Sequence, residues 1–363
     1  MVYLCLQPMA EGQASYAHVT GICDGFRDLG WQVNLRALTP ADTGGLLRRV
    51  LAGLWLQFRA LGLLLRERPD VLYIRWHPLA GLSVLGARAR RVPVVLEVNG
   101  PPEDFIAAWP RLRPLRRVIE RSLWWQLRRS VLAITVTEGL RAWLETLSTT
   151  QTEVVPNAAD PTTFRPEPEP TSDEAKYVLF FGALAPWQGL EPLLEAAARP
   201  EWPSDLQLWI AGSGQLRSTV EAAASARPDR IRYLGAVASE RMPQIVRRSQ
   251  MVAITKHYSR PDLGLSPIKL YEAMASGVPL IVSDLPGLGD VVRAHDCGVV
   301  LSEAPSAAEV CAAVLAMSRD QQRRQEFGWR AHCAAREHTW LKRAEATRQA
   351  IFYALDQSKK THD

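Results

Sequence analysis

Short apolar runs alternate with longer amphipathic stretches along the first part of the chain. The short runs are typical of strands buried on both faces, and the stretches between them repeat apolar side chains at helical spacing. Strands are predicted at 2–7, 32–37, 71–75, 94–98, 133–137 and 153–155. Helices are predicted at 15–29, 46–67, 79–90, 112–128 and 138–147. This alternation predicts a parallel sheet covered by helices on both faces.

The same alternation begins again after a cluster of prolines at positions 161, 166, 168 and 170, which is typical of an interdomain linker. Further strands are predicted at 177–181, 207–211, 231–234, 251–254, 280–283 and 298–301. A last helix at about 340–354 is expected to pack back on the first domain. The sequence therefore predicts an α/β protein of two Rossmann-like, doubly wound domains facing a cleft. They comprise residues 1–165 with 340–363, and residues 166–339.

Composition adds limits to this picture. The 363 residues are 47% apolar, enough for two cores, and no apolar run is long enough for a membrane span. The N-terminal run lacks a basic leader, so no signal peptide is expected. The five cysteines are scattered and odd in number, which favours reduced thiols in the cytoplasm. Metal-ligand spacing is lacking, and no metal is expected.

Positive charge is concentrated in the first domain. Residues 1–165 hold 20 Arg, no Lys and 14 acids, a net charge of +6, whereas the remainder has a net charge of −1. Segment 109–129 holds seven Arg and three Trp with Glu120 as its one acid, and segment 46–68 sets five Arg around Leu and Trp55. Arg with Trp is typical of helices lying in lipid headgroups. We therefore expect peripheral docking on an anionic cytoplasmic leaflet; the alternative is that the apolar side chains pack on the sheet and the arginines are only solvated. Without a recognition motif, no nucleic-acid partner is expected.

The segment 266–284 carries the most specific chemistry. Lys269 and Glu272 are three residues apart and share a helix face. A helix beginning at Ser266–Pro267 would offer free backbone N–H groups to an anion. Cation, amide donors and carboxylate together suit a nucleoside diphosphate, with the carboxylate accepting from ribose hydroxyls. The alternatives are a solvated helix lysine and a surface or capping carboxylate.

Glycines follow three predicted strands of the second domain. Gly182 ends the first of them, Gly212 and Gly214 follow the second, and Gly235 ends the third. A glycine at such a strand end lets the backbone approach a phosphate or sugar closely. Each turn by itself could equally be an ordinary strand-to-helix connection. Their recurrence in one half of the chain favours nucleotide binding there.

The order of these motifs resembles the retaining family-four glycosyltransferases of the GT-B fold, over nearly the whole chain. The matching segments are 70–73, 93–100, 155–166, 178–190, 208–214, 231–235 and 264–284. The resemblance implies transfer of a sugar from a nucleotide-sugar donor, with retention of anomeric configuration and without a metal or other cofactor. It also implies that the donor, UDP-sugar before GDP-sugar, binds the second domain and the acceptor binds the first.

Several positions depart from the family. Many members carry Arg and Lys, which hold the diphosphate, where this chain has Ala183 and Gln188. Many carry a Glu where this chain has Gly264, and a His where it has Asn99. Lys269 is well placed to supply the missing charge. A branch with a Ser-Pro-x-Lys-x-x-Glu block and Gln-Gly in the first loop is similar to this chain and largely builds cell-surface polysaccharides, so a glycan or polyprenyl-phosphate-linked acceptor is expected.

The resemblance implies roles for three groups of residues. The catalytic group is Lys269, Glu272 and Asn99. Donor-binding positions, with backbone N–H groups of Leu265 and Ser266 assisting Lys269, are Gly182, Ala183, Gly212, Gly214, Gly264, Leu265, Ser266, Lys269 and Glu272. The acceptor or cleft loop is represented by Gly12, Gln13, His18 and Glu103, although a lone helical histidine such as His18 is more often structural.

Two other functions remain open on the sequence. The chain could be a catalytically silent GT-B partner that binds a nucleotide or another transferase, as the missing Arg, Lys and Glu would favour. It could also be a GT-B epimerase acting on a nucleotide sugar, against which the basic first domain argues. Nucleotide binding and sugar transfer by the purified protein would separate them.

Overall fold

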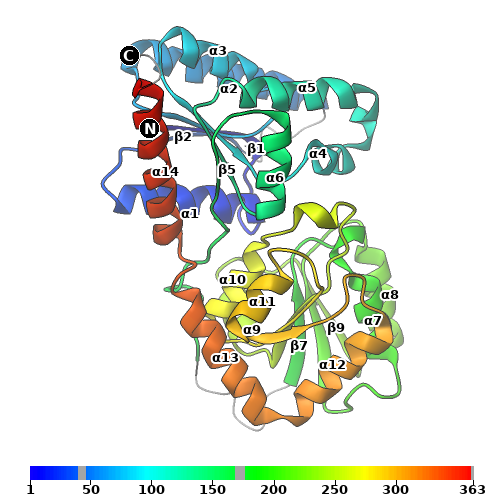
Figure 1. The fold of residues 1–363 in the computed structure, drawn as a ribbon. Coiled ribbons are helices and arrows are strands. Elements are labelled where there is room, and N and C mark those ends of the chain that lie inside the picture. Colours follow the sequence, from blue (N-terminus) through cyan, green and yellow to red (C-terminus); the bar gives the residue numbers. More distant parts are fainter. Residues whose placement is uncertain (40–45, 168–175, 361–363) are drawn as a thin grey trace. The chain divides into compact units, whose positions relative to one another are not determined.

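The computed structural model describes residues 1–39, 46–167 and 176–360. The chain divides into two compact units, Met1–Pro156 with Trp340–Asp363, and Asn157–Thr339. Each unit holds a six-stranded sheet whose adjacent strands all run parallel, with helices packed on both faces (Figure 1). The predicted class, two doubly wound parallel-sheet domains, is therefore confirmed.

The sheet of the first unit has the strand order β2-β1-β3-β4-β5-β6. Its strands are β1 (Val2–Pro8), β2 (Asn34–Leu38), β3 (Leu72–Arg75), β4 (Val94–Val98), β5 (Leu132–Thr135) and β6 (Thr152–Val154). The central strands are buried on both faces, which explains their nearly continuous apolar sequences. All predicted strands of the chain are present, with ends within two residues of those expected.

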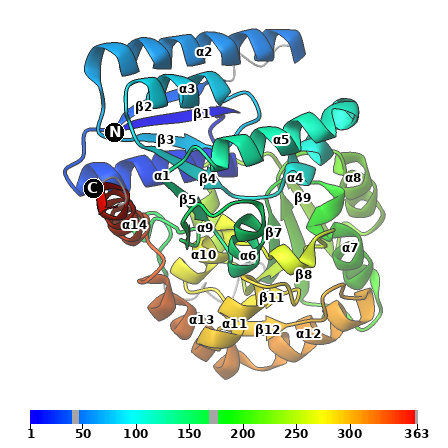
Figure 2. The ribbon, with the colours of Figure 1, turned by 45° about the horizontal axis from the view of Figure 1, so that its top comes forward.

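The helices of the first unit are α1 (Ala14–Asp28), α2 (Leu46–Glu67), α3 (Gly81–Ala89), α4 (Pro102–Ala108), α5 (Arg116–Leu127), α6 (Glu138–Leu147) and α14 (Trp340–Lys360). One core lies between the sheet and α2, α3 and α5; the other lies between the sheet and α1 and α14. Figure 2 shows α2 and α3 next to each other over the strands of this sheet. The helix expected at 112–128 was wrong at its start. A 3₁₀ helix, Pro110–Leu115, precedes α5, and Pro114 inside it has no backbone N–H to donate to an α-helix.

Helix α14 packs closely on α1. A Cβ built on Gly21 would lie 2.4 Å from the Trp340 ring, and one on Gly25 would lie 2.5 Å from the Trp340 carbonyl oxygen. The two glycines of α1 therefore let the backbone of α14 approach. This contact joins the last helix of the chain to the first unit.

The sheet of the second unit has the order β12-β11-β10-β7-β8-β9. Its strands are β7 (Lys176–Phe181), β8 (Leu206–Ala211), β9 (Ile231–Gly235), β10 (Met251–Ile254), β11 (Leu280–Val282) and β12 (Gly298–Val300). Its helices are α7 (Leu190–Ala198), α8 (Arg217–Ala226), α9 (Met242–Arg247), α10 (Ile268–Ala275), α11 (Gly289–His295), α12 (Ala307–Arg319) and α13 (Gln321–Ala335), with 3₁₀ turns at Pro186–Gln188 and Pro261–Leu263.

The two units divide between Pro156 and Asn157, earlier than the boundary expected between 165 and 166. The intervening residues pack on the second unit. Ala159 forms an isolated parallel bridge with Thr339 and donates its N–H to the His338 carbonyl, and Phe164 packs on the core of that unit. Of the linker prolines, 168 and 170 lie outside the described residues, as do 361–363 at the end of the predicted C-terminal segment.

Candidate active site

Two glycine turns meet at the carboxyl ends of β7 and β8. Gly182, Gly212 and Gly214 all have φ between +125° and +154°, where other residues are strained. A Cβ on Gly212 would lie 1.8 Å from the Gly182 carbonyl oxygen, and one on Gly214 would lie 2.5 Å from the Leu184 carbonyl oxygen. Gly212 and Gly214 are therefore required by the packing of the two turns on each other, a reason that the sequence did not indicate.

Lys269 lies in the first turn of α10 and reaches the turn after β7. Its ammonium donates a hydrogen bond to Gln188 Oε1 at 3.1 Å and lies 4.4 Å from the centre of the Phe180 ring. A Cβ on Gly182 would lie 3.4 Å from Lys269 Nζ. The structure thus brings Gly182, Gln188 and Lys269 together, with Gln188 as the acceptor that holds the lysine.

Burial raises the energy of both charged groups on this face of α10. Burial, and then the charge of Lys256, lower the pKa of Lys269 to about 7 against the opposing pull of Glu272. Burial raises the pKa of Glu272 to about 7, against the pull of Lys269. Within the described residues neither side chain has an ion-pair partner. A charged group with a perturbed pKa and no ion-pair partner, lying beside a glycine turn as Lys269 does, is typical of a functional site.

The loop before α10 corrects one expectation. The Leu265 N–H donates to the Pro286 carbonyl at 2.8 Å, so it is not free to bind phosphate. Gly264 has φ +72°, and a Cβ there would lie 2.7 Å from the Pro286 carbonyl oxygen, so this backbone has no room for the Glu that many family members carry. Ser266 is buried, and its hydroxyl accepts from the Asn157 N–H at 3.0 Å and pairs with the Tyr271 hydroxyl.

Asn99 immediately follows β4 at the carboxyl edge of the first sheet. Both polar atoms of its side chain are buried, and neither has a hydrogen-bond partner in the described part of the chain.

Sequence reasoning missed two residues at the same edge of the sheet, Arg75 and His77 at the end of β3. Arg75 donates from Nε to Gln7 Oε1 at 3.1 Å, and burial lowers the pKa of His77 to about 4. Both residues have cationic or aromatic side chains at the carboxyl end of a predicted strand, and this pattern could have identified them from the sequence.

The loop after β1 presents Gly12 and Gln13 to solvent. Gly12 has φ +79° with open space where a Cβ would stand, and Gln13 occupies the N-cap position of α1. Glu103 lies in the first turn of α4, where Arg116 donates to its Oε1 at 3.0 Å while Oε2 is buried without a partner. Asn99, Gly12, Gln13 and Glu103 belong to the first unit, and Lys269 and Glu272 to the second.

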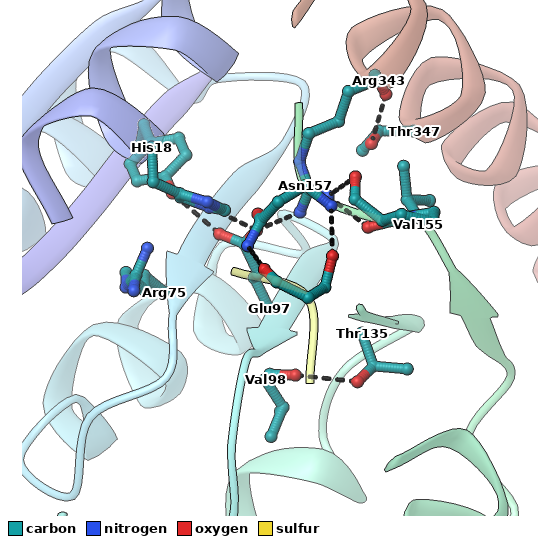
Figure 3. A network of polar contacts seen from close by, with 12 residues as sticks. His18, Arg75, Glu97, Val98, Thr135, Val155, Asn157, Arg343 and Thr347 are labelled. Atoms are coloured by element: carbon teal, nitrogen blue, oxygen red, sulfur yellow. Dashed lines mark hydrogen bonds and ion pairs between the residues drawn. The ribbon is translucent and has the colours of Figure 1, made fainter. Parts of the chain in front are cut away.

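His18 is not part of an accessible loop. Its Nε2 lies 2.7 Å from Oε1 of Glu97, which also accepts from Arg343 Nη2 at 2.7 Å, and Tyr3 donates to Oε2. Figure 3 shows His18, Glu97 and Arg343 pointing toward one another. His18 is 1% exposed, and burial lowers its pKa to about 4, so the neutral imidazole is favoured. The expectation that His18 contacts an acceptor was therefore wrong, because this network buries it.

Among the described residues, no group of three or more His, Cys, Asp or Glu side chains could hold a metal ion. In the same part of the chain, the helices are too short or too polar to cross a membrane.

Two family models match the two halves of the chain. Residues 16–163 match Glycosyltransferase Family 4, and residues 162–332 match Glycosyl transferases group 1. Together with the two parallel-sheet domains, these matches support a glycosyltransferase of the GT-B type.

Two relatives in sequence carry names of specific transferases. A D-inositol 3-phosphate glycosyltransferase of Nocardia farcinica is 30% identical over 220 residues, which are 56% of this chain and 48% of the relative. A phosphatidyl-myo-inositol mannosyltransferase of Mycobacterium leprae is 30% identical over 217 residues, 57% of this chain and 55% of the relative. The chain thus matches about half of these relatives' length.

Solved structures share the fold at low sequence identity. A sucrose-phosphate synthase from Thermosynechococcus elongatus superposes with a TM-score of 0.74 at 17% identity, covering 98% of this chain and 99% of that one. The HepE protein of Anabaena, in complex with UDP and glucose, superposes with a TM-score of 0.73 at 16% identity, covering 97% and 100%.

Proposed function

We propose that this protein transfers a sugar from a nucleotide-sugar donor to a glycan or polyprenyl-phosphate-linked acceptor, with retention of anomeric configuration. The observation that carries the proposal is Lys269, whose ammonium is fixed by Gln188 beside Gly182 and has no ion-pair partner among the described residues. A partly buried cation beside a glycine turn fits a diphosphate. UDP-sugar is the preferred donor and GDP-sugar the second; the solved HepE complexes with UDP and UDP-glucose support this order.

In the proposed reaction, the bond between the anomeric carbon and the diphosphate breaks while the acceptor oxygen bonds to that carbon on the same face. The acceptor proton passes to the leaving phosphate oxygen. Lys269 stabilises the negative charge that develops on the diphosphate, which makes a metal ion unnecessary. Glu272, three residues further along α10, accepts hydrogen bonds from the ribose hydroxyls.

The carboxyl edge of the first sheet is the proposed acceptor side. Asn99 offers a buried amide whose donor and acceptor lack partners in the described chain, and a bound hydroxyl would satisfy both. Gly12 and Gln13 lie in the loop after β1 at the same edge, and Glu103 retains one unpartnered carboxylate oxygen. Arg75 and His77 extend this group of polar residues.

Nucleotide binding tests the proposal directly. We expect UDP to raise the unfolding midpoint of the purified protein more than GDP or ADP does, because a ligand of the native state stabilises it. Loss of one or both ribose hydroxyls in deoxy analogues should weaken binding to the wild type, and Glu272→Gln should reduce this difference. A protein that binds none of these nucleotides contradicts the proposal. Binding without transfer or donor hydrolysis favours a silent partner.

We also propose that the outer face of α2, α3 and α5 docks on an anionic membrane at the cytoplasmic side. Helix α2 has two apolar stripes: Leu56, Ala60 and Leu64 pack on the core, while a second set faces solvent with exposed fractions of 53% to 66%. That second set is Leu51, Trp55, Phe58 and Leu65. Packing on the sheet therefore accounts for only one of the two stripes.

Neighbouring helices extend this face with apolar and basic side chains. Exposed apolar residues are Leu82 and Leu85 of α3, Leu115 before α5, and Val118 and Trp124 of α5. Exposed arginines are Arg48, Arg59, Arg66, Arg88, Arg116, Arg117, Arg121 and Arg128. Not every Trp points outward, because Trp125 packs on the core. Exposed apolar side chains and arginines on the same helices fit anionic headgroups, which attract the cations while the apolar groups enter the acyl boundary.

Vesicle co-sedimentation tests this surface. We expect binding to vesicles containing anionic lipid at low salt, and much weaker binding to purely zwitterionic vesicles. Trp55→Glu should sharply reduce the bound fraction, because it places a carboxylate within the apolar stripe. The matched control is Trp329→Glu on α13, since Trp329 is 68% exposed and Trp55 is 66% exposed. Equal binding by the two variants, or no binding by the wild type, contradicts the membrane proposal.

A further inference from the structure

The segment after β10 brings a second lysine to the edge where Lys269 lies. Thr255 Oγ1 donates to the Gly189 carbonyl at 2.7 Å, and the His257 N–H donates to the Trp187 carbonyl at 3.1 Å. Gly189 approaches so closely that a Cβ on it would lie 1.5 Å from the Thr255 carbonyl oxygen. The backbone of Lys256, between these two contacts, is therefore fixed against the turn Trp187–Gly189.

Lys269 meets the same turn through a side chain. Its ammonium donates to Gln188, the residue between Trp187 and Gly189. The lysine after β10 and the lysine of α10 are thus both attached to one three-residue turn at the carboxyl end of the sheet. Sequence reasoning singled out Lys269 but missed Lys256, which lies outside every motif.

Lys256 lies close enough to Lys269 for its charge to disfavour the protonated ammonium of Lys269. Lys256 is one of the causes that lower the pKa of Lys269 to about 7, after burial. The other charged group acting on Lys269 is Glu272 from its own helix, while β7 and the turn contribute the uncharged Phe180 and Gln188. Like charges close together in a partly buried site repel each other, and a bound dianion would reverse this effect.

We infer that Lys256 is a second phosphate-binding residue, and that Lys256 and Lys269 together hold the diphosphate of the donor. The inference deepens the proposed function and rests on it. It also explains how a donor site with Ala183 and Gln188 at two positions can still neutralise a diphosphate: the charge comes from the segment after β10 and from α10. Gln188 orients one of the lysines.

Removing Lys256 should lower the affinity for UDP and raise the pKa of Lys269. At pH 6.5, where Lys269 is largely protonated, Lys256→Met should weaken UDP binding by about tenfold or more, the usual effect of losing a hydrogen bond to a charged group. Without the repulsion from Lys256, the pKa of Lys269 should rise, so the decline in affinity with increasing pH should begin at a higher pH than in the wild type. Titration of UDP itself is common to both proteins and cancels in the comparison.

Isothermal titration calorimetry with UDP between pH 6.5 and 9 measures both effects. Lys256→Arg should keep affinity near the wild-type value, because it retains the charge. Lys176→Met is the matched control, because Lys176 begins β7 at the opposite end of the strand and pairs with Asp205 at 3.3 Å. It should bind UDP like the wild type. Thermal unfolding of each variant, with Lys256→Gln as a second neutral replacement, establishes that the proteins are folded.

Four results would overturn the inference. Unchanged UDP affinity in folded Lys256→Met removes Lys256 from the site while leaving the proposed function intact. Weaker binding with an unshifted pH profile, or an equal loss in Lys256→Arg, assigns Lys256 a structural role only. Failure of the wild type to bind any nucleoside diphosphate overturns the proposed function itself, and the inference with it.

Discussion

Lys269→Met is expected to lower kcat/KM for sugar transfer by about 10²–10³-fold, the usual effect of removing one group that stabilises developing charge. UDP binding should weaken as well, because the diphosphate loses the cation that Gln188 orients beside Gly182. Steady-state kinetics and calorimetry measure these effects. The control Lys176→Met should leave both unchanged.

Lys269→Met should not lower the stability of the folded protein. The pKa of Lys269 is lowered to about 7 in the native protein, below its ordinary value of about 10.4 in the unfolded chain. Between these values the unfolded chain binds more protons, so the contribution of Lys269 to stability rises with pH through that window and is unfavourable below it. At pH 7 the unliganded Met variant should therefore unfold at the same or a higher temperature. A large drop in that midpoint would assign Lys269 a structural role.

The affinity for UDP should change with pH in the direction opposite to the contribution of Lys269 to stability. An anion stabilises protonated Lys269, so UDP binding takes up a proton above the free pKa, and affinity should fall as pH rises through about 7. The Lys269→Arg variant should flatten this decline, because guanidinium remains charged throughout the range. A wild-type affinity that stays constant from pH 7 to pH 9 would contradict the proposed role of the ammonium.

Arg343→Met is expected to destabilise the first unit by about 3–5 kcal/mol, because it leaves the carboxylate of Glu97 buried without its charged partner. Both side chains of this ion pair are at most 1% exposed, and the distance from Arg343 Nη2 to Glu97 Oε1 is 2.7 Å. Arg343 also donates to the carbonyl oxygens of Val155 and Pro156. Chemical denaturation followed by circular dichroism measures the free energy of unfolding.

Two further variants distinguish the effect of the buried charge on the free energy of unfolding from a nonspecific effect of replacing an arginine. Arg343→Met combined with Glu97→Gln should recover part of the lost stability, because no uncompensated carboxylate remains. Arg27→Met removes an exposed pair with Asp24 and should change the free energy of unfolding little. If the exposed and the buried arginine cost the same, or if the double variant is less stable than Arg343→Met, the account given for this network is wrong.

The same network makes the first unit sensitive to acid. His18, Arg343 and Arg75 hold the pKa of Glu97 well below its usual range despite burial, so its contribution to stability is present above the unfolded carboxyl pKa and is lost as pH falls below it. The pKa of His18 is lowered to about 4, so between that value and its unfolded value of about 6.5 the unfolded chain binds more protons. The stability contributed by His18 therefore declines as pH falls from about 6.5 to about 4, and the stability contributed by Glu97 declines only below the unfolded carboxyl pKa of about 4.3.

The strands, the order of motifs and the Lys269–Glu272 pair could be predicted because each depends on local pattern. Apolar runs buried on both faces specify strands, and a spacing of three specifies a shared helix face. The break at Pro114 was also encoded locally but was overlooked within an otherwise helical pattern. Partners distant in sequence could not be predicted: Leu265 donates to Pro286, and His18 contacts Glu97, 79 positions away.

The amino-acid sequence by itself determined that this protein has two parallel-sheet domains and that one helix carries a lysine and a glutamate suited to a nucleotide. Only the tertiary structure decided which polar groups are used up within the fold and which remain for a ligand. Burial and the distance between groups remote in sequence set hydrogen-bond partners and pKa values. For that reason His18 and the Leu265 N–H are engaged within the fold, and the segment that carries Lys256 lies against the same turn as Lys269.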